Sequence, residues 1–370
     1  MLLDHVRHFV LANLSAAVAP NLFDKAVFFM TVLGHEAVVV FFVISGYLVA
    51  GLSIVRARDR PFDFGSYAAH RFSRIYVVLI PALVIGWAFD AAGSQWVNQS
   101  GLYTTSKSYG IVSIPIVTHN LSITTFLGNL AMVEDILTPR LGSNGPLWSL
   151  VYEWWYYCLF GAAAVAICHR GWPRALGAVA FLVMAIWLPF DLKLWGLIWL
   201  LGAAVAVYGA RHKFRPHLRI GGLAFVGALA ASRLAQSSEL VASMRYGGFL
   251  RDFALAIGYS TLLLSFQRPG PALPFANLHK RLAGFSYTLY LTHFPLVILC
   301  VSALYQFASV GFRQKPQLLS YGYMAALILL ALSYSFVFSR LTEAHTDYVR
   351  KRVTRLLQRL RAGRASREAA

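Results

Sequence analysis

Apolar stretches of about 20 residues, each long enough to cross a bilayer as a helix, recur along most of this chain and limit what it can fold into. Of its 370 residues, 58% are hydrophobic and only 13% are charged, whereas soluble domains carry about 25% charged residues. So much apolar surface excludes a disordered chain, and three cysteines are too few for a disulfide-stapled scaffold of this length. We therefore expect an all-α, polytopic transmembrane helix bundle with about ten spans, at roughly 5–20, 35–54, 74–92, 146–168, 174–190, 193–210, 219–232, 250–266, 284–305 and 320–340.

The positive charge of the chain has a topological explanation. Lys and Arg number 33 against 15 Asp and Glu, a net charge of +18. Most of this excess falls in alternate loops, at 56–74, 211–219 and 268–281, and beyond Arg340. Because cytoplasmic loops collect Lys and Arg, this pattern places both termini in the cytoplasm. The charge borders apolar spans, so we expect membrane lipids as partners and no nucleic acid.

The chain divides into a membrane domain at 1–345 and a basic cytoplasmic tail at 346–370. In the tail, four apolar residues recur at helical spacing among arginines: Val353, Leu356, Leu357 and Leu360. This pattern is typical of an amphipathic helix on an anionic leaflet. A frayed stop-transfer tail is the alternative.

Ionisable residues within apolar spans cost several kcal/mol, which makes each a functional candidate. Four groups stand out: Asp4 with Arg7 at the mouth of the first span, Arg71 with Arg74 at the entry to the third, Glu153 in the fourth, and His293 in the ninth. Arg71 and Arg74 are three residues apart, so one helix face presents both guanidinium groups.

Five ordered motifs contain or adjoin these residues: LLDHVR at 2–7, FFVISGY at 41–47, RFSR at 71–74, NGPLWSLVYEWWYY at 144–157 and FSYTLYLTHFPL at 285–296. Together they resemble the acyltransferase 3 family of integral-membrane enzymes. The resemblance implies an acyltransferase that moves groups other than amino-acyl groups. Its acyl group, most often acetyl, would pass from cytoplasmic acyl-CoA to a hydroxyl of a saccharide or lipid-linked glycan. The family's usual setting is a bacterial inner membrane, crossed many times.

The donor would meet three arginines. Coenzyme A carries a pyrophosphate and a 3′-phosphate, which arginine forks match bidentately. We expect Arg7, Arg71 and Arg74 to bind these groups; the alternative is that they anchor the cytoplasmic face. Ser45 lies mid-span beside Gly46, where small residues admit a thin ligand arm or a neighbouring helix. We expect no metal ion.

One departure concerns the catalytic base. In the family, a histidine taken as the base stands eleven positions after the opening arginine, and here that position is Val18. Transfer to an alcohol needs proton removal, worth about 10²–10⁴-fold. The candidates are His35, Glu36, Glu153 and His293; we favour His35 or Glu153, and His35 of the two, because a neutral imidazole is poised near pH 7. His293 lies in a motif that is structural or close to the site in the family.

The alternative function is a non-catalytic transporter or flippase. Coenzyme A binding would separate the acyltransferase from this alternative.

Overall fold

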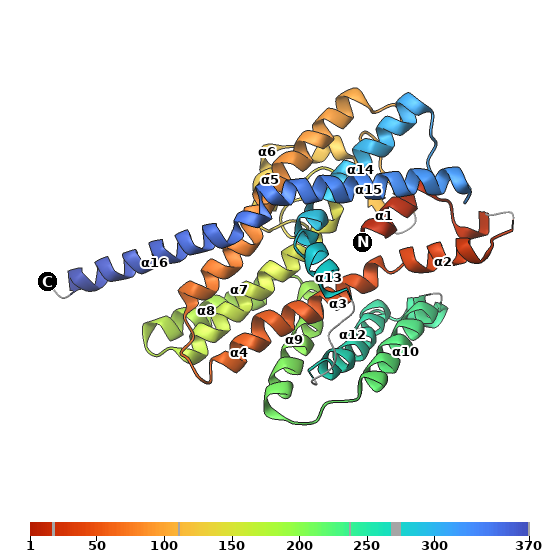
Figure 1. Ribbon diagram of the computed structural model, residues 1–370. Helices are drawn as coiled ribbons and strands as arrows, with labels where there is room; N and C mark the ends of the chain where they lie inside the picture. Colours follow the sequence, from red (N-terminus) through yellow and green to blue (C-terminus); the bar gives the residue numbers. More distant parts are fainter. Residues whose placement is uncertain (17–18, 110–111, 237, 268–274, 369–370) are drawn as a thin grey trace. The chain divides into compact units, whose positions relative to one another are not determined.

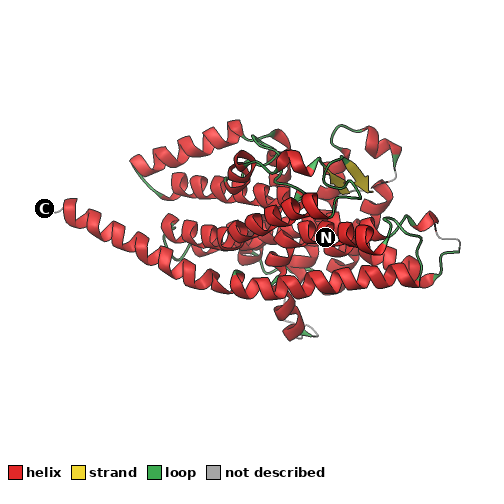
Figure 2. Cartoon of the chain, turned by 90° about the horizontal axis from the view of Figure 1, so that it is seen from above, coloured by secondary structure: helices red, strands yellow, loops and turns green. Residues whose placement is uncertain are grey.

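The computed structural model describes residues 1–16, 19–109, 112–236, 238–267 and 275–368, with 360–368 described by their backbone alone. Helices make up most of these ranges (Figure 2). Within them the strands are β1 (Lys107–Tyr109) and β2 (Val112–Ile114), which pair antiparallel with Lys107 opposite Ile114. The all-α class is confirmed.

Among the described residues, seven helical segments are long and apolar enough to cross a membrane. They are Leu22–Arg56, Phe64–Trp96, Gly145–Cys168, Phe190–Arg211, Leu218–Gln236, Ser286–Ala308 and Leu318–Arg359. The predicted spans at 174–190 and 250–266 correspond to the shorter or less apolar helices α8 (Trp172–Trp187) and α12 (Gly247–Ser265). The chain is thus a polytopic membrane protein.

The first predicted span, at 5–20, is wrong as a single helix. Helix α1 covers Leu2–Val10, about 14 Å at 1.5 Å per residue, or half of the ~30 Å hydrocarbon core. The chain then becomes extended at Leu11, because the carbonyls of Phe9 and Val10 accept hydrogen bonds from the backbone N–H groups of Arg313 and Gln314. A distant segment thereby satisfies carbonyls that a longer helix would have used. Val18 lies outside the described residues.

The described chain forms two compact units. Unit 1 comprises 1–34, 65–151 and 275–370, and unit 2 comprises 35–64 and 152–274. The first boundary follows Gly34, the second lies at the start of α5 (Phe64–Trp96), and the third falls within α7 (Trp148–Cys168) after Val151.

In unit 1, α1 packs against α14 (Ser286–Ala308) and α15 (Leu318–Leu341), which also pack against each other. Phe9, Phe294 and Leu327, one from each helix, belong to the buried core there. The stretch at 121–133 contains α6 (Ile123–Leu130), which Ser122 caps by accepting a hydrogen bond from the N–H of Thr125. The remaining helices of the unit are η1 (Leu14–Ala16), α2 (Leu22–Thr31), η3 (Val117–Asn120), η4 (Gly145–Leu147) and α13 (Ala276–Ala283).

The C-terminal part of unit 1 is one extended rod. Helix α15 leads through the short η5 (Glu343–His345) into α16 (Thr346–Glu368). Figures 1 and 2 both show α16 continuing the direction of α15. The basic tail is therefore helical over its described residues.

Unit 2 is built on close helix contacts. A continuous helical segment, α3 (Gly34–Gly46), the π-helical turn η2 (Tyr47–Gly51) and α4 (Leu52–Arg56), packs against α9 (Phe190–Arg211). At Gly46 a Cβ would collide with the carbonyl oxygen of Trp199, and at Gly202 with that of Val43. Helix α10 (Leu218–Gln236) lies beside α12 (Figure 1), and α11 (Glu239–Ser243) joins them.

Candidate active site

Two sequence motifs interlock within unit 1. Asn144 donates from Nδ2 to the carbonyl oxygen of Leu291 at 2.9 Å. The hydroxyl of Tyr290 lies 2.6 Å from Oγ of Ser149 and donates to the carbonyl oxygen of Pro146. The motif at 144–157 thus fixes the turn of α14 that carries His293.

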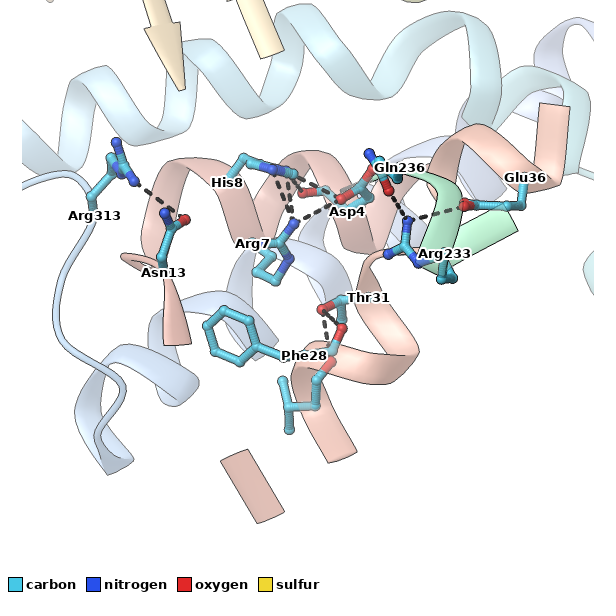
Figure 3. A network of polar contacts seen from close by, with 11 residues as sticks. Asp4, Arg7, His8, Asn13, Phe28, Thr31, Glu36, Arg233, Gln236 and Arg313 are labelled. Atoms are coloured by element: carbon cyan, nitrogen blue, oxygen red, sulfur yellow. Dashed lines mark hydrogen bonds and ion pairs between the residues drawn. The ribbon is translucent and has the colours of Figure 1, made fainter. Parts of the chain in front are cut away.

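Arg7 belongs to a buried polar cluster on one face of α1. Its Nη2 lies 3.0 Å from Oδ1 of Asp4 and 3.0 Å from Nε2 of His8, and its guanidinium stands over the ring of Phe28 (Figure 3). Burial opposes ionisation of Asp4, but hydrogen bonds and charges from His8 and Arg7 outweigh it, so the pKa of Asp4 is lowered. The carboxylate therefore holds the guanidinium in place.

On its other side α1 brings a second histidine to His293. The rings of His5 and His293 are stacked at 5.2 Å between centroids and 5° between planes. Nδ1 of His5 lies 2.9 Å from Nε2 of His293. Nδ1 of His293 lies 2.8 Å from the carbonyl oxygen of Leu289 and 3.0 Å from that of Tyr290. Both imidazoles are buried.

Arg74 is held by a carboxylate that sequence reasoning missed. Its Nη1 donates to Oε1 of Glu343 at 2.9 Å, and its guanidinium lies 4.9 Å above the ring of Tyr287. The other oxygen of Glu343 accepts from N and Oγ1 of Thr288, at 3.2 and 2.9 Å. The Arg74 side chain is still 48% exposed, so a ligand can reach it. Arg71, one turn earlier, lies over the ring of Tyr67.

Ser45 and Glu153, both predicted site residues, meet in unit 2. Oγ of Ser45 donates to Oε1 of Glu153 at 2.6 Å, and the hydroxyl of Tyr157 donates to the same oxygen. Trp199 donates from Nε1 to Oγ of Ser45 at 3.1 Å. This buried network ties α3, α7 and α9 together.

His35 has an acidic partner. Its Nε2 lies 2.9 Å from Oδ2 of Asp252, whose other oxygen accepts from Arg251. The side chain of His35 is 34% exposed. The neighbouring Glu36 is paired instead with Arg233, at 2.9 Å (Figure 3).

The predicted residues are thus divided between the units. Unit 1 holds Arg7, Arg71, Arg74 and His293, and unit 2 holds His35, Ser45 and Glu153. Sequence reasoning missed His5, Glu343 and Asp252. His5 stands two residues before Arg7 in an opening motif already singled out, and Asp252 lies inside a predicted span, so both carried a readable signal. Glu343, at the end of the last apolar stretch, did not.

Comparisons with known proteins agree with these motifs. The sequence model of a family described as "Acyltransferase domain", acyltransferase 3, matches residues 8–340. An O-acetyl transferase of Shigella phage Sf6 is 26% identical over 195 residues, which are 47% of this chain and 52% of the relative. The chain therefore aligns with about half of that relative's length. No solved structure matches the chain.

Proposed function

Because this chain belongs to the acyltransferase 3 family over residues 8–340, we propose that it is a membrane acyltransferase that moves an acetyl group from acetyl-CoA to a hydroxyl of a saccharide or lipid-linked glycan. The observation that carries the proposal is this family match, which includes all the motifs except the first, at 2–7. The name of the phage relative, an O-acetyl transferase, supports the acetyl group and an oxygen acceptor.

The arginines of unit 1 support an acyl-CoA donor. Arg74 is half exposed, and Glu343 holds its guanidinium in a fixed orientation. A guanidinium has five N–H donors, so one carboxylate contact leaves others to bind phosphate oxygens. Arg71 and Arg7 belong to the same unit, and all three are expected on the cytoplasmic side, where acyl-CoA is made.

The reaction itself is an exchange of esters. The acceptor oxygen bonds to the acyl carbon, the bond from that carbon to sulfur breaks, and coenzyme A leaves with the proton that the hydroxyl gave up. No metal or redox partner is needed for this balance. The proton must pass through a base, and the candidates from the sequence are His35, Glu36, Glu153 and His293. The cellular setting that we propose is a bacterial inner membrane.

A transporter or flippase is the second candidate, and Val18 favours it, since a chain that moves a solute needs no base at that position. The two candidates differ in coenzyme A binding, which only the enzyme requires.

The test is release of free thiol from acetyl-CoA by the purified full chain in detergent, with and without a cell-envelope glycan extract. Coenzyme A binding is measured in parallel. The variants are Arg71→Ala and Arg74→Ala, and the control is Arg359→Ala, an exposed arginine of α16. Thiol release that rises with extract and falls only in the first two variants supports the enzyme. A chain that neither binds coenzyme A nor releases thiol would contradict the enzyme and leave the transporter.

A further inference from the structure

The stacked pair of His5 and His293 has its proton positions fixed by its partners. A backbone carbonyl oxygen can only accept, so Nδ1 of His293, facing the carbonyls of Leu289 and Tyr290, carries a hydrogen. In a neutral imidazole the other nitrogen is then an acceptor, which makes Nε2 of His293 the acceptor for His5. His5 therefore carries its hydrogen on Nδ1, and its Nε2 keeps a lone pair.

That lone pair is not used elsewhere in the described part of the chain, where no hydrogen bond of His5 Nε2 to another residue is found. The His5 ring lies in unit 1, packed edge-on against Phe294, and retains 8% exposure. An unprotonated imidazole nitrogen of known tautomer, oriented by a second side chain, is the arrangement that a general base requires.

The surroundings keep this nitrogen unprotonated at physiological pH. Burial lowers the pKa of His5 well below its ordinary value, because a buried site disfavours the charged imidazolium. His5 is therefore in the proton-accepting form from neutral pH down into the acidic range.

We propose that His5 is the proton acceptor in acyl transfer, through its Nε2, and that His293 is the residue that positions it. This inference rests on the proposed function. The acceptor hydroxyl gives its proton to Nε2 of His5 as its oxygen bonds to the acyl carbon. The bond from carbon to sulfur breaks, and Nε2 returns the proton to the departing thiolate.

His293 strengthens a base that burial would otherwise weaken. As Nε2 of His5 takes up the proton, Nδ1–H of His5 can shift towards Nε2 of His293. The positive charge is then shared with a ring whose Nδ1–H faces two carbonyl oxygens, and such hydrogen-bond chains polarise one another. The proton-accepting role, which in the family belongs to a histidine at the position of Val18, then falls to His5 on α1.

The location also suits a donor held by arginines. His5 and Arg7 project from different faces of α1, His5 towards α14 and Arg7 towards Asp4, His8 and Phe28. In acyl-CoA the pantetheine arm separates the phosphates from the thioester, so the base should not adjoin the phosphate-binding group. Oε1 of Glu153, by contrast, is occupied by the hydroxyls of Ser45 and Tyr157.

The test compares His5→Ala, His35→Ala and Glu153→Gln, with His119→Ala as a control at an exposed histidine. The full chain in detergent is assayed for thiol release from acetyl-CoA with glycan extract, and for coenzyme A binding. His5→Ala should lower kcat by about 10²–10⁴-fold while binding coenzyme A normally. Added imidazole should restore part of this loss, which it would not do for a packing defect.

His293→Gln tests the positioning role. Its side-chain oxygen can still accept from Nδ1 of His5 but cannot share the charge. We expect kcat to fall and the acid limb of kcat/KM to move to lower pH, since protonated His5 loses the ring that shares its positive charge.

Three outcomes would overturn the inference while the proposed function stood. They are thiol transfer by His5→Ala at the wild-type rate, no rescue by imidazole in a variant that still binds coenzyme A, or imidazole rescue of His35→Ala instead.

If His5→Ala fails to fold, the wild-type chain is treated with diethyl pyrocarbonate, which modifies unprotonated imidazole, and its thiol transfer is followed. Loss of transfer in step with modification of His5 supports the inference, and an unmodified His5 contradicts it. A wild-type chain that neither binds coenzyme A nor releases thiol would defeat the proposed function itself.

Discussion

Glu343 shows how much one carboxylate can organise. It receives hydrogen bonds from Arg74 on α5 and from both the backbone and the hydroxyl of Thr288 on α14. Nη1 of Arg74 is thereby restrained, while the rest of the guanidinium remains open to water. An arginine ordered in advance loses less side-chain entropy on meeting a phosphate than a free one.

The fork geometry can be tested with a substitution that keeps the charge. Arg74→Lys retains a cation but not the planar guanidinium. A hydrogen bond to a charged group contributes about 1.5–3 kcal/mol, so losing one should weaken coenzyme A binding at least about tenfold. Calorimetric titration with coenzyme A would measure this. Equal affinity in the lysine variant would show that Arg74 acts as a simple positive charge or does not touch the donor.

The buried His5 predicts a pH-dependent stability. Its pKa is lower in the folded chain than in the unfolded chain, so below the unfolded value of about 6.5 the unfolded chain binds more protons. Stability contributed by neutral His5 is therefore complete above about pH 6.5 and declines as the pH falls below it. Asp4 acts in the same direction, but only near and below its own unfolded value of about 4.

Thermal unfolding in detergent between pH 7.5 and pH 5, a window that brackets the ordinary histidine pKa of about 6.5, measures the effect. The wild-type Tm should fall across this window, and the fall should be smaller in His5→Gln. A parallel decline in the two chains would contradict the assignment.

At the scale of elements, the hydropathy of the sequence predicts most of the helices but does not predict where each one ends. Each predicted span from 35–54 onward contains a helix, since long apolar runs in a bilayer leave the backbone few alternatives. The end of α1 depends on Arg313 and Gln314, some 300 positions along the chain, and no local pattern announces that contact.

The site shows the same division between local and tertiary information. His35, Glu153 and His293 were found because polar residues in apolar runs stand out. Their partners could not be assigned, because the pairing of His35 with Asp252, or of His293 with His5, depends on which helices pack together. The functional roles of these residues remain predictions.

The contact between α3 and α9 allows a matched test of helix packing. Gly46→Ala places a Cβ against the carbonyl oxygen of Trp199, whereas at Gly227 on α10 a Cβ meets nothing within 4 Å. Overpacking of a tight contact costs about 1–3 kcal/mol, while Gly→Ala in an open helix position gains up to about 1 kcal/mol. Tm should therefore fall in Gly46→Ala and stay level or rise in Gly227→Ala. A Gly46→Ala chain as stable as the wild type would mean that the two helices can separate without loss.

For the whole molecule, the main expectation is orientation. Basic loops on one side predict that both termini face the cytoplasm. Helix α15 then separates Gly311, in the loop before it, from Arg359 in α16.

Single-cysteine labelling on intact cells tests this orientation. Cys158, Cys168 and Cys300 are first replaced by serine, and Gly311→Cys or Arg359→Cys is added. A membrane-impermeant maleimide should label Gly311→Cys in intact cells and Arg359→Cys only after lysis. Labelling in the opposite order would invert the topology and remove the expected route of acyl-CoA to the arginines.

The continuity of α15 with α16 has a mechanical consequence. The helical segment Leu318–Arg359 has 42 residues, roughly 60 Å at 1.5 Å per residue, about twice the ~30 Å of a hydrocarbon core. When α15 crosses the bilayer, the remaining half extends beyond it as a long helical arm, joined through η5. A small tilt of α15 within the membrane would therefore be amplified at the far end of α16, so a fluorescent probe at Arg359 would report that motion from outside the bilayer.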